Sequence, residues 1–455
     1  MLEKFFKLKE NGTNVKTEII AGITTFMTMA YILAVNPKIL GAAGMDPNAV
    51  LVATALASFV GTICMALMAN YPFALAPGMG LNAYFAYSVC LGFGLDWRVA
   101  LLAVFCEGII FIVLSITNVR EAIFNAIPAT LKLAVSGGIG LFITFIGLQD
   151  AKLVVNDDST LLTYQKFHEN FHSVGIGAVL ALIGVIIIAI MLIKNVKGAI
   201  LIGILLTWIL GMLCQAVGLY VPNADLGMYS LYPTLDNWFI LPTISETFGQ
   251  VFKADFSEIH IFNFIAIIFA FLFVDVFDTI GTLIGVSAKA DMLDEEGKLP
   301  RIKGALMADA VATTVGAVLG ASTTTTYVES ASGVSAGGRT GLTAVTTAIL
   351  FALSVFFAPI FMAIPSFAIA PALIIVGFMM ISAVTKIDFS DPAEGIPAFL
   401  CIAAMPFAYS ISEGIAIGVI SYVIVNLVTG KAKEKKISIL MYVLAVLFVC
   451  KYIFL

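Results

Sequence analysis

Charged side chains are scarce in this chain of 455 residues. They make up 12% of it, about half of the share found in soluble globular proteins, whereas 60% of the residues are hydrophobic. The apolar runs are each about 20 residues long and do not alternate with polar residues, which excludes an outer-membrane barrel. Because lipid leaves only helices and closed barrels to satisfy the backbone, the composition predicts an all-α polytopic membrane protein.

Further absences from the sequence exclude several classes of function. The six cysteines have no CxxC spacing and lie in or beside apolar runs, so we interpret them as packing residues and not as metal ligands. The sequence has no basic tract of the kind that binds nucleic acid, no Ser/His/Asp arrangement of the kind found in enzymes, and no GxxxxGK[ST] motif of the kind found in ATP-driven pumps. The sequence therefore predicts no catalytic activity, no metal, no cofactor and no nucleic-acid partner.

The apolar runs predict fourteen membrane-spanning segments. They are 18–36, 48–69, 73–93, 98–118, 131–148, 174–193, 198–220, 261–287, 303–321, 323–338, 340–360, 367–385, 393–409 and 411–429. The segment from Thr323 is too polar to be identified by hydropathy, and its inclusion rests on the positive-inside rule. With fourteen spans and the N-terminus inside, 18 Lys and Arg residues fall inside and five outside. Without it, the basic run Lys431–Lys436 would lie outside. The remaining tail, 437–455, is either a fifteenth span or an interfacial helix, and we favour the latter.

The two halves of the chain resemble each other. Ala53–Gly61 matches Ala308–Gly316, Ala76–Gly78 matches Ala331–Gly333, and Ala126–Pro128 matches Ala363–Pro365. Because seven spans is an odd number, the second copy is inverted relative to the first. The third span of each copy is polar and interrupted by Gly or Pro, which is typical of a secondary transporter with its site at the membrane midplane.

Five acids lie at predicted membrane depth, where each costs roughly 2.5–3.5 kcal/mol on insertion scales. They are Glu107, Asp275, Asp278, Asp309 and Glu329. Asp275 and Asp278 share one helix face, and we expect one of them to be structural. Asp309 either functions in the site or ties two helices together. We interpret Glu107 as an interhelical hydrogen-bond partner and Glu329 as a functional residue.

The polar groups near the broken spans favour one class of ligand. Carboxyls, the Asn82 amide, Ser and Thr hydroxyls and exposed N–H groups of half-helices offer both donors and acceptors, although Asn82 is also suited to capping a half-helix. This set suits a small, planar, neutral ligand with ring donors and acceptors. No fixed basic residue is predicted at depth, which argues against an inorganic anion, and buried acids are able to carry a coupled proton.

Four motifs carry a resemblance to a known family. They are LEKFFKLKENGTNVKTEIIAGITTFMTMAYILAVNP (2–37), ALAPGMGLNAYFAY (74–87), FLFVDVFDTIGTLIG (271–285) and STTTTYVESASGVSAGGRTGLTA (322–344). With them the chain resembles the AzgA-like purine permeases, the guanine–hypoxanthine–adenine branch of the nucleobase–cation symporters. The resemblance implies the fold of the uracil and xanthine permeases, with spans 1–4 and 8–11 as a core and spans 5–7 and 12–14 as a gate. It also implies short crossing strands in the third and tenth spans, and proton symport by movement of the core against the gate.

The resemblance also implies roles for individual residues. Asp275 and Glu329 correspond to irreplaceable purine-binding acids, Asn82 to a polar contact of the third span, and Asp278 and Asp309 to acids that support coupling or site geometry. The sister branch, the nucleobase–ascorbate transporters, has Gln/Glu-Asn-x-Gly at the tenth span. Here Ser330 stands in place of that Asn, in Glu329-Ser-Ala-Ser-Gly333. This departure favours purines over uracil, xanthine or ascorbate, but a uracil or xanthine permease, and an anion carrier or channel, stay as alternatives.

The predicted organisation follows from these spans. We expect an N-terminal cytoplasmic tail (1–17), the first half of the core (18–118), the first half of the gate (119–220) and an extracytoplasmic loop (221–260). The second halves of the core (261–360) and gate (361–430) follow, and then a basic linker with a hydrophobic helix (431–455). The expected location is the cytoplasmic membrane, with the N-terminus and the basic linker in the cytoplasm. The expected partners are a purine base, a proton and the lipid bilayer, and the resemblance suggests a homodimer through the gate.

Overall fold

The computed structural model describes residues 2–117, 127–168, 170–223, 226, 228–233, 243–255, 259, 261–289, 292 and 299–454. Side chains of residues 262, 277, 281, 284, 285, 288, 289, 451, 453 and 454 lie outside this description. Within the described part, the chain is almost entirely helical. Residue Ala126 of the predicted repeat and much of the predicted loop 221–260 are not covered.

The first half of the chain contains the following elements. They are α1 (Leu2–Phe5), α2 (Val15–Met29), α3 (Ile32–Ala42), α4 (Pro47–Met68), β1 (Leu75–Pro77), α5 (Met79–Ala83), the π-helix η1 (Tyr84–Gly92), α6 (Trp97–Ile116), α8 (Ala129–Asp150), β2 (Val154–Asp157), β3 (Leu161–Tyr164), the π-helix η2 (Phe171–Gly175), α9 (Ile176–Ile193) and α10 (Ala199–Ala216).

The second half contains a similar series. Its elements are the 3₁₀ helix η4 (Gln250–Lys253), α11 (Ile261–Lys289), α12 (Ile302–Leu319), β4 (Thr324–Thr326), α13 (Ser330–Ser335), α14 (Gly341–Ser354), the 3₁₀ helix η5 (Val355–Phe357), α15 (Ala358–Ala363), α16 (Ser366–Ile381), the 3₁₀ helix η6 (Ser382–Lys386), α17 (Pro392–Phe407), α18 (Ile411–Val428) and α19 (Ile439–Phe454).

Polar residues fix where several of these helices begin. Asn14, Asp46 and Ser410 are the N-cap residues of α2, α4 and α18, and each side chain accepts a hydrogen bond from a backbone N–H of the first turn. Pro47 follows Asp46 at the first helical position, where its missing N–H costs nothing. Such caps satisfy N–H groups that have no partner within the helix, so the helix starts are encoded locally.

Eleven helical stretches of the described chain are long and apolar enough to cross a membrane, so the predicted polytopic helical architecture is confirmed. The three other predicted spans differ from these. Spans 73–93 and 323–338 are each interrupted by a strand, and α17, in the thirteenth predicted span, has only 16 residues. The first predicted span is also divided, because α2 and α3 are separated at Ala30 and Tyr31.

The two strands that the resemblance implies are present at the centre of the molecule. β1 and β4 pair antiparallel with Ala76 opposite Thr325, and every residue of both strands is buried. Gly61 of α4 and Gly316 of α12 both face this pair, since a Cβ at either position would lie within 3.4 Å of Thr324. Both glycines close the longest predicted repeat match, which therefore corresponds to equivalent helices before the two strands.

One predicted repeat match is wrong. Ala76–Gly78 covers the end of β1 and the residue before α5, whereas Ala331–Gly333 lies inside α13. Small residues recur in both places for different reasons, because those in β1 meet a neighbouring strand and Gly333 meets Ala21 and Thr25 of α2. The match at Pro128 and Pro365 fits better, since each immediately precedes a long helix, α8 or α16.

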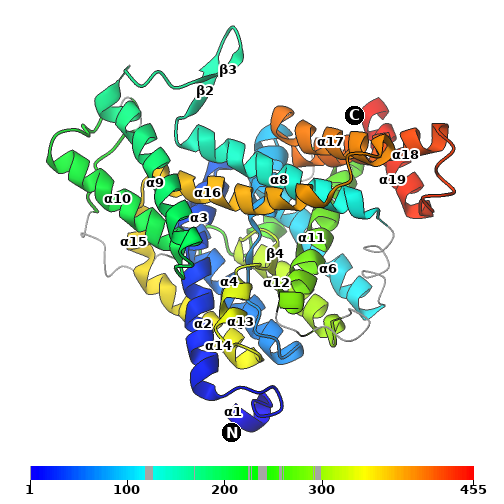
Figure 1. Ribbon diagram of the computed structural model, residues 1–455, viewed down its shortest axis with the longest axis horizontal. Coiled ribbons are helices and arrows are strands. Elements are labelled where there is room, and N and C mark those ends of the chain that lie inside the picture. The colour runs from blue at the N-terminus through cyan, green and yellow to red at the C-terminus, as the bar shows by residue number, and fades with distance from the viewer. Residues whose placement is uncertain are drawn as a thin grey trace.

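Packing divides the helices into two groups. In the first, α2, α3, α4, α6, α11, α12, α13 and α14 pack around β1 and β4, and in the second, α8, α9, α10, α16, α17 and α18 pack on one another. Figure 1 shows α8, α16 and α17 running across the top of the view, with β4, α12, α13 and α14 below them. Within the second group α8 and α16 approach closely, because a Cβ at Gly140 would lie 2.6 Å from the Gly377 carbonyl oxygen.

The C-terminal tail lies along a predicted span. In α19 the Tyr452 hydroxyl bonds the carboxylate of Glu413, in the first turn of α18, while α19 begins just beyond the opposite end of α18. The two helices are therefore antiparallel neighbours. The interfacial orientation that we favour for this tail stays a prediction, and α19, with 16 residues, is not among the eleven candidate spans.

Candidate functional site

Glu329 lies at the N-terminus of α13, shortly after β4. Its carboxylate accepts a hydrogen bond of 2.7 Å from the hydroxyl of Tyr31, which is fully buried at the break between α2 and α3. Glu329 also lines a cavity of about 290 Å³, the Glu329 cavity, together with Thr28, Ser332 and Met379 of α16. The acid is thus held by one group of helices at a surface that faces the other.

A second cluster of oxygen atoms surrounds the hydroxyl of Thr279. This hydroxyl lies 2.9 Å from Asp275 Oδ1, 2.8 Å from Asp309 Oδ1 and 2.6 Å from Thr325 Oγ1. All four side chains are buried. Thr279 therefore joins α11, α12 and β4.

The geometry of this cluster bears on how many protons its two aspartates carry. A threonine hydroxyl has a single hydrogen and two lone pairs, so Thr279 donates to one of its three neighbours and accepts from the other two. If it donates to either aspartate, the other aspartate must donate to it, and if it donates to Thr325, both must. With one two-centre hydrogen bond for each neighbour, at least one of Asp275 and Asp309 carries a proton, whereas a hydrogen shared between the two carboxylates needs no proton on either acid.

Asp278 lies beside that cluster, since a Cβ at Gly78 would lie 3.4 Å from its Oδ2 and 2.6 Å from Thr325 Cγ2. It lines a cavity of about 380 Å³, the Asp278 cavity, with Val274 and Thr282 of α11 and with Ile139 of α8. Lys132 in the first turn of α8 also lines this cavity, so one basic side chain reaches it from the second group of helices. Both cavities are similar in size to small-molecule pockets, and both lie between the two groups of helices.

Asn82 and Ser330 hold the strands in place. The Asn82 amide donates to the Pro77 carbonyl oxygen at 3.2 Å and its oxygen accepts from the Ser322 hydroxyl. The Ser330 hydroxyl accepts from the Ala74 backbone N–H at 3.0 Å. Asn82 and Ser330 therefore each link the segment around β1 to the segment around β4, and both are buried.

The structure distributes the predicted site residues over four places. Asp275 and Asp309 meet at Thr279, Asn82 and Ser330 flank the strands, and Asp278 and Glu329 line separate cavities. Glu107 is a hydrogen-bond partner as predicted, but its bond is not interhelical: its Oε2 accepts a hydrogen bond of 2.7 Å from Thr323 Oγ1, in the non-helical segment before β4.

Two contributors were missed from the sequence. Tyr31 lies within the first resemblance motif, but a tyrosine in an apolar helix is usually a packing residue, so only its neighbourhood to Glu329 reveals its role. Thr279 lies one turn after Asp275, and that spacing on one helix face was the available signal. Among the described residues, no cluster of three or more His, Cys, Asp or Glu side chains is placed to hold a metal ion.

A further contact joins the two groups of helices away from these acids. Lys38 Nζ of α3 lies 2.7 Å from Asp150 Oδ2 at the end of α8, and both side chains are 23% exposed. Nearby, the Tyr409 hydroxyl donates to Gln149 Oε1 at 3.0 Å, and its ring packs edge-on against Tyr87 of η1. These ends of the helices are the ones predicted to face outward.

Known proteins resemble this chain over its whole length. It is 46% identical to the guanine/hypoxanthine permease PbuO of Bacillus subtilis, over 97% of this chain and 98% of that protein. It is 42% identical to the adenine permease AdeP of Escherichia coli, over 100% of this chain and 96% of that protein. Among solved structures, the transmembrane domain of the cyanobacterial bicarbonate transporter BicA matches with a TM-score of 0.60 and 15% identity, covering 89% of this chain and 97% of that one. This last likeness concerns the fold alone.

Residues 16–417 match the Permease family (Xan_ur_permease). This range includes Tyr31 and Glu329, the cluster around Thr279, and the paired strands β1 and β4. Together with the whole-length relatives, it identifies a multi-pass membrane transporter and not an enzyme. The chain belongs to the Permease family.

Proposed function

We propose that this permease takes up purine nucleobases, namely guanine, hypoxanthine or adenine, across the cytoplasmic membrane. The observation that carries the proposal is the whole-length similarity to permeases named for guanine/hypoxanthine and for adenine. The buried acids and hydroxyls between the two groups of helices support it, because they offer the acceptors and donors that a neutral purine ring requires.

We assign the base to the surface where the two groups of helices meet. In this proposal Glu329 and Asp275 bind the purine, while Asn82 and Ser330 contact it from the half-helices that they hold against the strands. Tyr31 orients the Glu329 carboxylate through its 2.7 Å hydrogen bond. A purine needs a gap between α11 and α13 in which both acids reach it, which movement of the second group of helices is proposed to provide.

We propose that transport is coupled to protons. The support is the Thr279 cluster, whose three contacts are each made by a separate hydrogen bond when Asp275 or Asp309 carries a proton. Purine binding at Asp275 and proton binding at Asp309 are then linked through one hydroxyl. Asp278, on the next turn of α11, is proposed to support this exchange from its own cavity.

We propose fourteen crossings with the N-terminus in the cytoplasm. Eleven candidate spans, the two strand-broken segments and α17 add up to that number, and with it 18 of the Lys and Arg residues fall inside. α19 packs beside α18 and is not counted among the fourteen crossings. The basic linker around Lys431 stays in the cytoplasm.

We propose that the two groups of helices are the expected core and gate and that they move as such. The core takes 18–118 and 261–360, and the gate takes 119–220 and 361–430, with a homodimer through the gate. The Lys38–Asp150 ion pair joins α3 of the core to α8 of the gate at the predicted outer side. We propose that this contact closes the outer side in the conformation seen here.

Competition of hypoxanthine uptake tests the proposed substrate class. Cells that express the permease take up labelled hypoxanthine, and excess guanine or adenine is expected to compete while uracil is not. Inhibition by uracil alone would favour a uracil or xanthine permease. Reversal potentials that follow an inorganic anion would favour an anion carrier or channel.

A further inference from the structure

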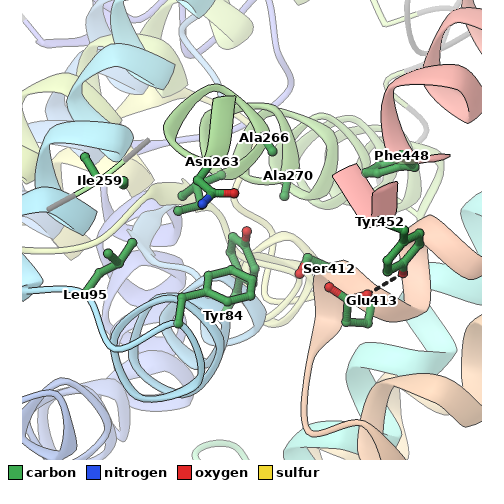
Figure 2. Close-up of a pocket in the computed structure, with 12 residues that line it drawn as sticks. Tyr84, Leu95, Ile259, Asn263, Ala266, Ala270, Ser412, Glu413, Phe448 and Tyr452 are labelled. Atoms are coloured by element: carbon green, nitrogen blue, oxygen red, sulfur yellow. Dashed lines mark hydrogen bonds between the residues drawn. The ribbon is translucent and has the colours of Figure 1, made fainter. Parts of the chain in front are cut away.

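A third cavity lies between η1, α11 and α18. It has a volume of about 430 Å³ and is lined by Tyr84, Asn263, Ser412 and Glu413, with Phe448 of α19 on one side. We refer to it as the Tyr84 cavity. Figure 2 shows Tyr84 and Asn263 on one side of this space and Ser412 and Glu413 on the other. It is thus lined by core and gate elements, as are the cavities of Asp278 and Glu329.

One face of α11 connects this cavity with the Asp278 cavity. Asn263, Ile267 and Ala270 line the Tyr84 cavity, and Val274 and Asp278 line the Asp278 cavity. These residues recur every three or four positions and therefore lie on one face of the helix. The two cavities follow each other along that face, and about one helical turn separates them.

An aromatic contact lies at the level of this separating turn. The ring of Tyr84 packs edge-on against Phe271 of α11, with ring centroids 4.7 Å apart. Both side chains are almost completely buried. A ligand that passes along this face of α11 from one cavity to the other must therefore pass Tyr84.

The lining chemistry selects a class of ligand. The Asn263 amide offers both donor and acceptor groups, the hydroxyls of Tyr84 and Ser412 do likewise, and Glu413 offers carboxylate oxygens. Among the described residues that line the cavity, none is basic, which disfavours an inorganic anion beside Glu413. Aromatic rings of Tyr84 and Phe448 supply flat apolar surface.

We propose that the Tyr84 cavity is a second, weaker binding site for a purine nucleobase, at which the base docks on its way to the acids of the central site. The inference rests on the proposed purine transport and deepens it. A neutral heteroaromatic ring matches both the polar groups and the aromatic walls. In the proposed orientation Asn263 begins the eighth span at the outer side, so docking occurs from outside.

Equilibrium binding of labelled hypoxanthine and labelled adenine to the purified permease tests this site. The variants are wild type, Glu329→Gln, Glu329→Gln with Asn263→Ala, and Glu329→Gln with Ile265→Ala. Ile265 is 54% exposed on another face of α11 and serves as the matched control. We expect Glu329→Gln to retain one weak site, and Asn263→Ala to weaken it about five- to tenfold further, as for a lost hydrogen bond.

The result that overturns the inference is distinct from failure of the proposed function. The docking site alone is overturned if wild type binds a purine but Glu329→Gln shows no residual binding. It is also overturned if wild type binds a purine and the two double variants bind it equally. Wild type that binds neither purine overturns the proposed function with it. Glu413→Gln in the Glu329→Gln background, which preserves side-chain size, is expected to weaken the same site and guards against misfolding of the Asn263→Ala variant. Unchanged melting temperatures verify that each variant is folded.

Discussion

At the scale of single residues, transport depends in this account on a few buried oxygen atoms. Tyr31 donates to Glu329 at 2.7 Å, and Thr279 brings Asp275 and Asp309 to within 3 Å of one hydroxyl. A hydrogen bond to a charged group contributes about 1.5–3 kcal/mol net, so the loss of one acceptor is enough to change binding greatly. Two predictions follow at this scale, one for the base and one for the proton.

Replacing Glu329 by Gln is expected to reduce purine uptake at least about a hundredfold, while the protein still reaches the membrane. The amide preserves shape but gives up one carboxylate oxygen, and with it the acceptor for Tyr31 or for the base. Uptake of labelled hypoxanthine or adenine measures the effect. Glu10→Gln, in an exposed ion pair with Lys7, is the control. Wild-type uptake by Glu329→Gln would refute the site assignment.

Replacing Asp309 by Asn is expected to separate binding from coupling. The amide still donates to Thr279, so the cluster keeps its hydrogen bonds, but it cannot release a proton. Purine exchange across the membrane should persist within about tenfold of wild type, whereas accumulation driven by a proton gradient should be lost. Accumulation at the wild-type level in Asp309→Asn would show that the proton is carried elsewhere.

The sequence was informative about these residues only where charge made them conspicuous. Acids at membrane depth are costly and therefore stand out, so Asp275, Asp278 and Glu329 were predicted. Tyr31 and Thr279 are residue types that apolar helices tolerate, and their partners lie far away in sequence or depend on the path of β4. Only the packed structure reveals them.

At the scale of elements, the strand-broken segments and the contacts between helix groups position the acids. The break in the tenth span was predicted because Gly, Ser and Thr are concentrated there, and the crossing strands were implied by the resemblance. The register of β1 against β4 was not predictable, since it is set by residues such as Thr62, which bonds the backbone of Leu75 in both directions. Long-range contacts such as Lys38 with Asp150 leave no local signal at all.

Breaking the Lys38–Asp150 ion pair is expected to favour opening of the outer side. Such a partly buried pair is worth about 1 kcal/mol, or about a fivefold change in the population of two conformations. The reporter is Cys90, which is 6% exposed one turn beyond Tyr87, in a variant that lacks the other five cysteines. Lys38→Met should accelerate its labelling by a membrane-impermeant maleimide about fivefold.

Exchanging the two charges provides the decisive control for the Lys38–Asp150 ion pair. Lys38→Asp combined with Asp150→Lys should restore slow labelling, because the ion pair is rebuilt in reverse. Lys7→Met, which removes an exposed cation far from this contact in the chain, should leave the rate unchanged. Equal labelling rates in wild type and Lys38→Met would contradict the assignment of this contact as a closure of the outer side.

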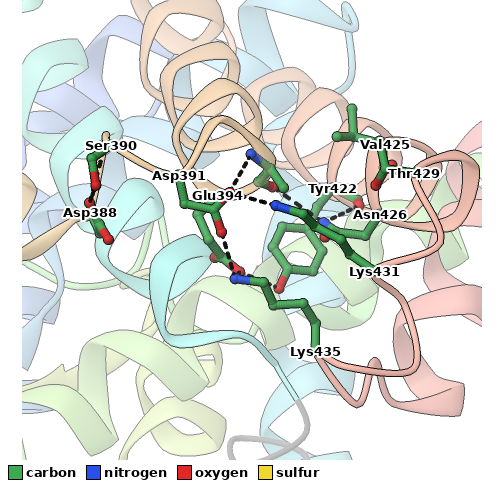
Figure 3. A network of polar contacts seen from close by, with 11 residues as sticks. Asp388, Ser390, Asp391, Glu394, Tyr422, Val425, Asn426, Thr429, Lys431 and Lys435 are labelled. Atoms are coloured by element: carbon green, nitrogen blue, oxygen red, sulfur yellow. Dashed lines mark hydrogen bonds and ion pairs between the residues drawn. The ribbon is translucent and has the colours of Figure 1, made fainter.

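A polar cluster connects the start of α17 to the linker that follows α18 (Figure 3). The Asp391 carboxylate accepts hydrogen bonds from Lys435 at 2.8 Å, from Lys431 and from the backbone of Ala393, which hold its pKa well below the usual range. Glu394 accepts from the Tyr422 hydroxyl at 3.0 Å and pairs with the same Lys435. The cluster thus connects the linker after α18 to the first turn of α17.

Replacing Asp391 by Asn is expected to lower the melting temperature of the purified protein by about 1–3 °C at pH 7. A carboxylate with a lowered pKa stabilises the fold above its unfolded pKa, and this stabilisation is lost as pH falls through the folded value. The difference between wild type and variant should therefore persist at pH 5 and shrink in stronger acid. Asp388→Asn, which loses only local bonds to Ser390, should change less. A difference that instead grows on acidification would contradict this role.

At the scale of the whole molecule, composition and charge were sufficient for the class and for the position of most helices along the chain. Twelve of the fourteen predicted spans appear as helices within a few residues of their predicted ends, apart from the break at Tyr31, and the other two contain the strands. The position of α19 beside α18 was not predictable, because its apolar sequence suits either a span or the interface and does not specify which helix it packs on. The division into core and gate likewise depends on long-range packing.

The central claim is purine transport driven by protons, and uptake into proteoliposomes tests it most directly. The purified permease is reconstituted, an inside-alkaline pH gradient is imposed, and labelled hypoxanthine, guanine, adenine and uracil are supplied in turn. The account predicts that at least one purine accumulates above its external concentration, that uracil does not, and that a protonophore abolishes the accumulation. Absence of purine accumulation, or accumulation that ignores the protonophore, would contradict it.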